Sequence, residues 1–349
     1  MKRDEVYDKI LGSMVCCALG DAMGAVTENL SFDQIRDKYP GGVRELIAPD
    51  KTAFAYGNTP GQITDDFSQT YLLTEEIIKN GGSINAECVE NMLIRWSGIP
   101  KWFNRFAGPT TRSAISEIKA KKEGREYVVN EVIDYARQAT NGSAMKISPA
   151  GFFNPCNIDN AIEDAVCITR VTHDNQLAIS GACATAAAVS KAFEQNATVY
   201  DIIQAGIYGA AKGEEIGMKV SRTVGGASVK ERIGMAVSLA LLPETKEERL
   251  RKIYNLVGTG LHVSEAVPAA FGILLICNGD SLDTVYEAVN IGYDTDTVAA
   301  IAGSIVGALN GTKGIKEEFF EIINRENEIS LEETAQKAAA LALKKNGEV

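Results

Sequence analysis

Residues 11–24 read LGSMVCCALGDAMG and residues 294–311 read DTDTVAAIAGSIVGALNG, and in both stretches small residues recur at every fourth position. Residues four apart lie on one face of an α-helix, so each stretch predicts a helix with one nearly bare face. The small residues are Gly12, Cys16, Gly20 and Gly24 in the first stretch and Ala299, Gly303, Gly307 and Gly311 in the second. A glycine within a helix costs about 0.8–1.0 kcal/mol relative to alanine, and we expect close helix packing as the compensation.

Helical periodicity continues along most of the chain, whereas few segments show the period of two that is typical of half-buried strands. Connections are short, and no Pro/Ser-rich linker or low-complexity tract divides the chain. We therefore predict an all-α fold, a single compact domain over residues 1–349. Helices are expected at 6–24, 66–80, 85–96, 110–122, 127–139, 159–170, 175–194, 199–216, 229–241, 246–257, 264–277, 281–291 and 295–310, with a further one at the C-terminus.

The composition excludes several classes of function. Among the 349 residues, 35 Lys and Arg stand against 46 Asp and Glu, which gives a net charge of −11. This acid excess argues against a nucleic-acid partner, because a phosphate-binding surface needs cationic side chains. Only two histidines occur, His173 and His262, so a three-histidine zinc site is impossible. A polyanionic ligand would need a local device such as a metal ion or a helix N-terminus.

The seven cysteines and the apolar segments bear on where the protein works. No cysteine pair has C-x-x-C spacing, and scattered cysteines in a long chain are typical of free thiols in a reducing compartment. Acidic residues precede the apolar run at 11–20, which argues against a secretory signal. No stretch approaches the roughly 18 apolar residues of a membrane span. We expect a cytoplasmic protein without a membrane partner; the oligomeric state is not indicated.

Two acidic clusters each open a predicted helix, namely Thr64-Asp65-Asp66 and Asp294-Thr295-Asp296-Thr297. Taken singly, either cluster is explained as a helix N-cap with acids that complement the helix dipole. Two such clusters favour another interpretation, because neighbouring carboxylates repel one another unless a cation lies between them. Carboxylate and hydroxyl oxygens suit Mg²⁺ or Mn²⁺ rather than zinc.

Three further segments are candidates for the same site. The segment GDAMGAVTE at 20–28 is either a helix end with a solvent carboxylate or the source of one more site carboxylate, Glu28. The turn NGSAMK at 141–146 could direct backbone N–H groups at a phosphate, although turn chemistry alone also explains it. His173 lies near a helix start, where a lone histidine is more often structural than functional.

Five segments together resemble the ADP-ribosylglycohydrolase family, in the order in which the family carries them. They are GDAMGAVTE at 20–28, TDDFSQ at 64–69, NGSAMK at 141–146, THDNQLAISGA at 172–182 and GYDTDTVAAIAGSIVGALNG at 292–311. Each segment is weak evidence alone, but the set spans most of the chain. The resemblance implies a domain of orthogonally packed helices and a hydrolase that binds two Mg²⁺ or Mn²⁺ ions.

The resemblance also implies roles for particular residues. The metal ligands would be Thr64, Asp65, Asp66, Asp294, Asp296 and Thr297. Substrate contacts would come from Asn141, Gly142, Ser143, Met145 and His173, which match segments that shape the ADP-ribose pocket. In the family the ions hold the hydroxyls of a ribose while water attacks its anomeric carbon, and carboxylates can stabilise the positive charge that develops on the sugar. Glu28 or Asp65 would position or deprotonate that water; the sequence does not separate the two.

Departures from the family pattern bear on the substrate. Tyr293 stands where many members have glycine, so an aromatic ring could stack on a base or narrow the ribose site. Lys146 replaces an arginine of the phosphate loop, and a point charge replaces a bidentate donor. Segment 102–112 is aromatic and basic, and it is either core packing or the substrate entrance. The expected substrate is a protein-linked or free ADP-ribose compound. The alternatives are a small nucleoside-like riboside and a non-catalytic ligand-binding role, against which the complete carboxylate set argues.

Overall fold

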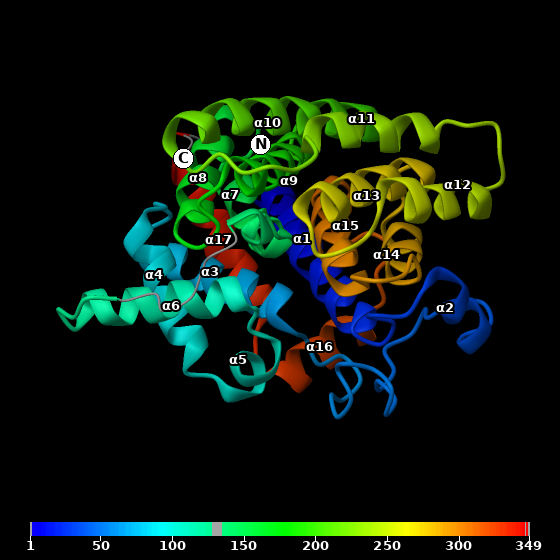
Figure 1. The fold of residues 1–349 in the computed structure, drawn as a ribbon, viewed down its shortest axis with the longest axis horizontal. Helices are drawn as coiled ribbons and strands as arrows, with labels where there is room; N and C mark the ends of the chain where they lie inside the picture. Colours follow the sequence, from blue (N-terminus) through cyan, green and yellow to red (C-terminus); the bar gives the residue numbers. More distant parts are fainter. Residues whose placement is uncertain (1, 128–134, 346, 348–349) are drawn as a thin grey trace.

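Helices make up most of the computed structural model, which describes residues 2–127, 135–345 and 347 (Figure 1). Within these residues it contains two isolated β-bridges but no strand. The helices are α1 (Arg3–Gly24), α2 (Phe32–Lys38), α3 (Asp65–Lys79), α4 (Ala86–Ser97), α5 (Pro100–Phe106), α6 (Pro109–Lys122), α7 (Ser148–Phe152), α8 (Ile158–Arg170), α9 (Gln176–Ala192), α10 (Val199–Val220), α11 (Val229–Ala240), α12 (Lys246–Lys252), α13 (Val263–Ile276), α14 (Ser281–Val289), α15 (Thr295–Asn310), α16 (Glu317–Asn327) and α17 (Leu331–Lys345).

Helices α1 and α15 pack backbone against backbone at the centre of the fold (Figure 1). A Cβ added to Gly307 would lie 2.1 Å from the carbonyl oxygen of Gly12, and one added to Gly20 would lie 2.4 Å from that of Ala299. Neither distance leaves room for a side chain. The close packing predicted from the small residues is therefore confirmed, and it brings the C-terminal end of α1 to the N-terminal end of α15.

The remaining helices surround this central pair and bury it in one continuous core. Almost every residue of α9, α13 and α15 is buried. The all-α fold and its single compact domain are confirmed. None of the described helices has the length and apolar content that a membrane crossing requires. No cysteine forms a disulfide, and five of the seven are buried: Cys16 and Cys17 in α1, Cys88 in α4, Cys183 in α9 and Cys277 directly after the end of α13.

Several elements differ from the sequence prediction. Most of the predicted helix 127–139 lies outside the described residues, and its described end, Tyr135–Gln138, is a short 3-10 helix. The predicted helix 246–257 ends as an α-helix at Lys252 and continues as a π-helical turn over Ile253–Val257. Helices α2, α5, α7 and α16 were not predicted. They contain only 5 to 11 residues, too few for a helical period to stand out.

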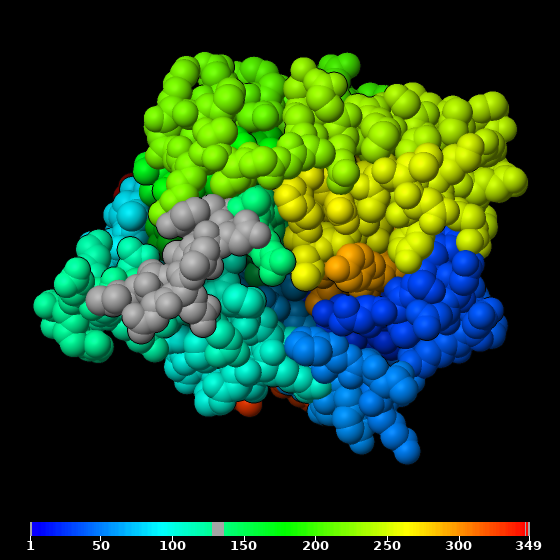
Figure 2. Space-filling model, viewed as in Figure 1, coloured from blue at the N-terminus to red at the C-terminus, as the bar shows by residue number. Residues whose placement is uncertain are grey.

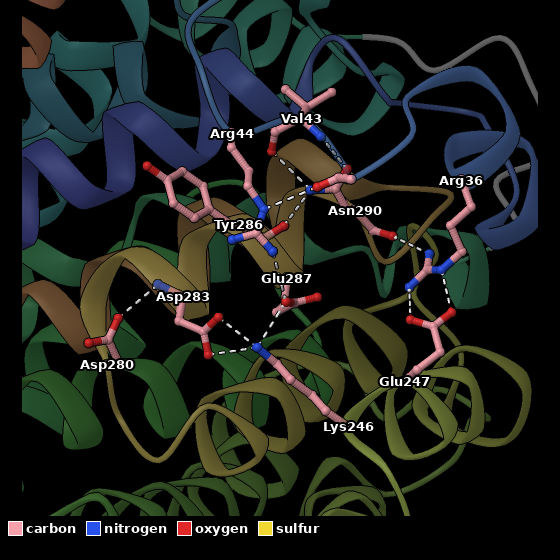
Figure 3. Close-up of polar contacts among 11 residues, drawn as sticks. Arg36, Val43, Arg44, Lys246, Glu247, Asp280, Asp283, Tyr286, Glu287 and Asn290 are labelled. Carbon is pink, nitrogen blue, oxygen red and sulfur yellow. Dashed lines mark hydrogen bonds and ion pairs between the residues drawn. The ribbon is translucent and has the colours of Figure 1, made fainter.

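The segment between α2 and α3, residues 39–64, is called here the 39–64 loop. It lacks helix and strand, yet a buried asparagine fixes each of its ends. Near the first end, the side chain of Asn290 accepts a hydrogen bond from the N–H of Val43 at 2.8 Å and donates to its carbonyl at 3.0 Å (Figure 3). Near the second end, Asn327 donates to the carbonyl of Gly61 at 2.8 Å and accepts from the N–H of Ile63 at 3.0 Å.

Ion pairs surround the first of these asparagines. Lys246 lies between Asp283 and Glu287 of α14, and Arg36 of α2 pairs with Glu247 (Figure 3). These contacts join α2, α12 and α14 at the surface. Exposed pairs of this kind contribute about 0–1 kcal/mol each, so we regard them as fixing orientation rather than as a main source of stability.

Candidate metal and sugar site

Carboxylates from three chain segments meet in one cavity. Glu28 follows the end of α1, Asp65 and Asp66 form the first turn of α3, and Asp294 and Asp296 lie at the start of α15. The surface is hollowed near this place, between the cyan, yellow, orange and blue segments of the chain (Figure 2). The other residues of the lining are Phe54, Phe106, Gly108, Pro109, Thr110, Thr111, Thr140, Asn141, Gly142, Met145, His173, Leu261 and Thr297.

Asp21 holds the N-terminus of α3 from the neighbouring helix α1. Its carboxylate is fully buried and accepts hydrogen bonds from the N–H of Thr64 at 2.9 Å, the hydroxyl of Thr64 at 2.7 Å and the N–H of Phe67 at 2.9 Å. The Thr64 side chain itself does not cap α3. Asp21 therefore takes the place of the usual N-cap residue and fixes the turn that carries Asp65 and Asp66.

The sequence prediction missed this role of Asp21. The residue follows Gly20, whose bare face contacts α15, so its position beside the small-residue series is the only signal that the sequence offers. Carboxylate oxygens of Asp21, Asp66 and Asp296 lie within 4.8 Å of one another. The hydrogen bonds from Thr64 and Phe67 already occupy the carboxylate of Asp21, so we regard it as a positioning residue.

We expect Asp21→Asn to weaken Mn²⁺ binding about 10- to 100-fold, the usual effect of losing a group that orients metal ligands. The amide would present N–H donors to the backbone N–H groups of Thr64 and Phe67, so the first turn of α3 would shift. Calorimetric titration with Mn²⁺ measures the effect. Asp201→Asn is the control, because the Asp201 carboxylate also accepts hydrogen bonds at a helix N-terminus, from the N–H and hydroxyl of Thr198 in the capping box of α10, but does not line the cavity. Equal Mn²⁺ affinity in wild type and Asp21→Asn would contradict the role.

Three carboxylate oxygens in the site are buried without any hydrogen-bond partner: Oε2 of Glu28, Oδ1 of Asp66 and Oδ1 of Asp296. An orphaned buried acceptor is costly, and three acceptors of like charge need a cation to compensate them. Hard oxygen donors of this kind fit Mg²⁺ or Mn²⁺. The predicted ligands Asp65, Asp66, Asp294, Asp296 and Thr297 all line the cavity, whereas Thr64 lies behind it against Asp21.

Burial raises the pKa of every carboxyl group in the site, and repulsion between the site carboxylates adds to the shift for Glu28, Asp65, Asp66 and Asp296. Burial raises the pKa of Glu28 to about 8, with the charges of Asp294 and Asp65 adding to the shift. Burial likewise raises the pKa of Asp65 to about 7, with a further contribution from Asp21. The pKa values of Asp66 and Asp296 are raised well above the ordinary range for the same reasons.

We expect the metal-free protein to lose stability as the pH rises from about 5 to about 8. In the folded protein Glu28, Asp65 and Asp21 hold their protons more tightly than in the unfolded chain. The unfolding free energy therefore falls as the pH rises from the unfolded pKa values near 4 to the folded values of about 6 to 8. The Tm should fall on the order of 5 °C with EDTA present, and Mg²⁺ should restore it. Thermal melts across this pH range test the expectation, and a rising Tm without metal would contradict it.

Lys146 lies beneath the carboxylates rather than in the cavity. It is fully buried, and its Nζ donates to Oε1 of Gln69 at 2.9 Å. Burial lowers its pKa to about 8, and the charges of Asp65 and Asp66 oppose this shift. Lys146 is thus a counter-charge for the acid cluster, and the cavity lining contains no lysine or arginine among the described residues.

The predicted substrate residues divide into two groups. Asn141, Gly142, Met145 and His173 line the cavity, whereas Ser143 is buried away from it with its hydroxyl unpartnered. The side chain of Asn141 donates to Oδ2 of Asp294 at 2.5 Å, so this residue orients a carboxylate. The ring of His173 lies between the hydroxyls of Thr140 and Thr172, and burial lowers its pKa to about 3. It is a neutral wall of the cavity.

Tyr293 does not enter the cavity as the sequence prediction expected. Its backbone is left-handed, with φ of 68°, and it is held by hydrogen bonds with Asn29 and Leu30 at 2.8 Å each. The ring consequently lies against Gly260 and is 44% exposed. A glycine would adopt this backbone without strain, whereas tyrosine adopts it at some cost.

Segment 102–112 combines both of the interpretations that the sequence left open. Trp102 is buried in the core, whereas Phe106 and the residues from 108 to 111 line the cavity. Arg112 donates to the carbonyls of Phe103, Asn104 and Ala107, so its charge stabilises the turn between α5 and α6. Phe54, from the 39–64 loop, also lines the cavity, and no pattern in the sequence indicates this position.

Comparison with known proteins agrees with this fold. The family model described as ADP-ribosylglycohydrolase matches residues 2–347. The uncharacterized protein YegU of Escherichia coli is 28% identical over 88% of this chain and 89% of its own length. The ADP-ribosylarginine hydrolase Tri1 of Serratia proteamaculans is 25% identical over 93% of this chain and 78% of its own. A solved structure titled ADP-ribosylglycohydrolase-related protein complex has a TM-score of 0.68 at 21% identity, covering 97% of this chain and 99% of that one.

The fold and the family model together define an all-helical hydrolase of glycosidic bonds. The chain belongs to the ADP-ribosylglycohydrolase family.

Proposed function

We propose that the protein hydrolyses the glycosidic bond at the ribose anomeric carbon of an ADP-ribosylated substrate, with two Mg²⁺ or Mn²⁺ ions bound. The observation that carries the proposal is the set of three unpartnered carboxylate oxygens, on Glu28, Asp66 and Asp296, beside one cavity. The ligands would be Asp65, Asp66, Asp294, Asp296 and Thr297, with Thr64 supporting the first turn of α3. Bound ions of this kind orient a sugar and acidify water.

The carboxylates have a second use in such a reaction. Cleavage of a ribosyl bond develops positive charge on the sugar ring, and a bed of carboxylates stabilises that charge. Glu28 is the better candidate for moving the proton, because one of its oxygens is unpartnered and its pKa of about 8 lies near physiological pH. Asp65 is the alternative. His173 is unsuited to this role because it is neutral and hydrogen-bonded on both ring nitrogens.

A small nucleoside-like riboside is a second candidate substrate, and the charge of the cavity favours it. Five carboxylates line the cavity, whereas Lys146 is turned away to Gln69. The diphosphate of ADP-ribose would have no cationic side chain to meet among the described lining residues. Backbone N–H groups of the turn at 141–146 would have to hold it, as the sequence predicted for a phosphate. A neutral riboside needs no such contact.

The test is a hydrolysis assay with Mg²⁺ on ADP-ribosyl-arginine, ADP-ribosyl-serine and a panel of nucleosides. Release of ADP-ribose from either of the first two supports the leading proposal, whether the physiological substrate is protein-linked or free. Turnover of nucleosides alone would replace the leading proposal with the second. Enzyme stripped with EDTA is the control, and full activity in that sample would remove the metal from the proposal. The cytoplasmic location stays a prediction, consistent with cysteines that form no disulfide.

A further inference from the structure

Two phenylalanines form an aromatic part of the cavity wall. The rings of Phe54 and Phe106 meet edge to face, with centroids 5.9 Å apart and planes at 74°. Phe106 is 8% exposed and packs with Ala25 and Ala55 in a small apolar cluster separate from the main core. Phe54 is 50% exposed although it lines the cavity. Phe54 is thus accessible to a ligand as well as part of the cavity lining.

The backbone around Phe54 is fixed on both sides of the ring. The guanidinium of Arg105, in α5, donates to the carbonyl of Phe54 at 2.6 Å, to the carbonyl of Tyr56, and to the side chain of Asn58 at 3.2 Å. The two buried asparagines described above anchor the ends of the same loop. An exposed aromatic side chain on such a fixed backbone is ready for contact, because little conformational entropy is lost when a partner binds.

We infer that Phe54 stacks against a planar heteroaromatic ring of the substrate while the site with the five cavity carboxylates holds the ribose. The inference rests on the proposed function. A polarisable apolar face is the contact that such a ring prefers, and base–aromatic stacking tolerates many different bases. The ring could be the adenine of ADP-ribose or the base of a nucleoside. Arg105 acts as a positioning residue, because it holds the carbonyl of Phe54 rather than the ligand.

The test compares ligands with and without a ring on the full-length protein in Mg²⁺. Calorimetry would give the Kd of ADP-ribose, of a C-nucleoside, whose carbon–carbon bond resists hydrolysis, and of ribose 5-phosphate. We expect Phe54→Ala to weaken the ring-bearing ligands about 10-fold and to leave ribose 5-phosphate within about 2-fold. Phe54→Tyr should restore binding. Loss for ADP-ribose alone or for the C-nucleoside alone identifies the source of the ring, and either result supports the inference.

Tyr56→Ala is the matched control. Tyr56 belongs to the same loop, is 56% exposed and does not line the cavity, so its loss should change none of the three affinities. Arg105→Ala should reproduce the ring-selective loss, because it frees the backbone at Phe54. If Phe54→Ala weakens all three ligands equally, or none of them, the inference is overturned. If wild type hydrolyses a riboside and Phe54→Ala leaves its KM unchanged, only the inference about Phe54 is overturned. If wild type hydrolyses no riboside, the proposed function is overturned as well.

Discussion

Asp294→Asn is expected to abolish hydrolysis and, at the same time, to make the metal-free protein more stable. Asp294 is buried in the site, where it accepts a hydrogen bond from Asn141 and its charge raises the pKa values of four neighbouring carboxyl groups, those of Glu28, Asp65, Asp66 and Asp296. Removal of one ligand charge should lower kcat by about 10³-fold or more, which corresponds to about 4 kcal/mol. Removal of one repelling charge should raise the Tm measured in EDTA.

The opposite signs of these two effects distinguish a metal site from a structural cluster. The measurements are kcat with saturating Mg²⁺ and thermal melts in EDTA. Asp174→Asn is the control, because Asp174 pairs with Arg170 at the surface and does not line the cavity. If Asp294→Asn lowered the Tm in EDTA and left Mg²⁺ binding intact, the carboxylates would be structural and the assignment of the metal ligands would be wrong.

Gly24→Ala should disrupt the site as well as the fold, whereas Gly12→Ala should disrupt the fold alone. A Cβ on Gly24 would lie 2.4 Å from the Cα of Asp296, and one on Gly12 would lie 2.4 Å from the backbone of Gly311, at the far end of the same helix pair. Neither contact can relax without a shift of helix backbone. We expect each change to lower the unfolding free energy by about 1–3 kcal/mol or more.

The difference between these two variants is measured at a temperature where both are folded. Mn²⁺ titration should show weaker binding for Gly24→Ala, since Asp296 must move, and unchanged binding for Gly12→Ala. Denaturant unfolding gives the two stabilities. Gly234→Ala serves as the control, because a Cβ at Gly234 meets no atom within 4 Å. Equal Mn²⁺ affinity in all three variants would show that the α1–α15 contact does not set the geometry of the site.

The central fold and the acidic site could be predicted because both depend on local sequence patterns. Small residues at every fourth position determine which helix faces meet. Acidic residues at the starts of two helices indicate where negative charge is concentrated. Thr64, Asp65 and Asp66 indeed open α3, and Asp294 to Thr297 open α15. These features depend on residues close together in sequence.

The features that could not be predicted depend on contacts between distant segments. Asp21 caps α3 from another helix, 43 residues away from Thr64 in sequence. Phe54 reaches the cavity only because Asn290, Asn327 and Arg105 hold its loop. The direction of the Tyr293 side chain follows from its left-handed backbone. A tyrosine in the sequence does not predict that backbone conformation. The side chain of Lys146 is buried and donates to Gln69. A basic residue in a turn would instead be predicted to be exposed to solvent or to a ligand.

The three contacts that hold the 39–64 loop have a consequence for how this enzyme could diversify. Asn290, Asn327 and Arg105 hold the loop mainly by hydrogen bonds to its backbone N–H and C=O groups. Every residue type except proline has both of these groups. Exposed side chains between these contacts, such as Phe54, can therefore be exchanged without moving the loop or the carboxylates at the ends of α1, α3 and α15. Substrate preference and bond-breaking chemistry thus lie on separately mutable parts of the chain, and a change at position 54 could redirect the enzyme while the acid cluster stays the same.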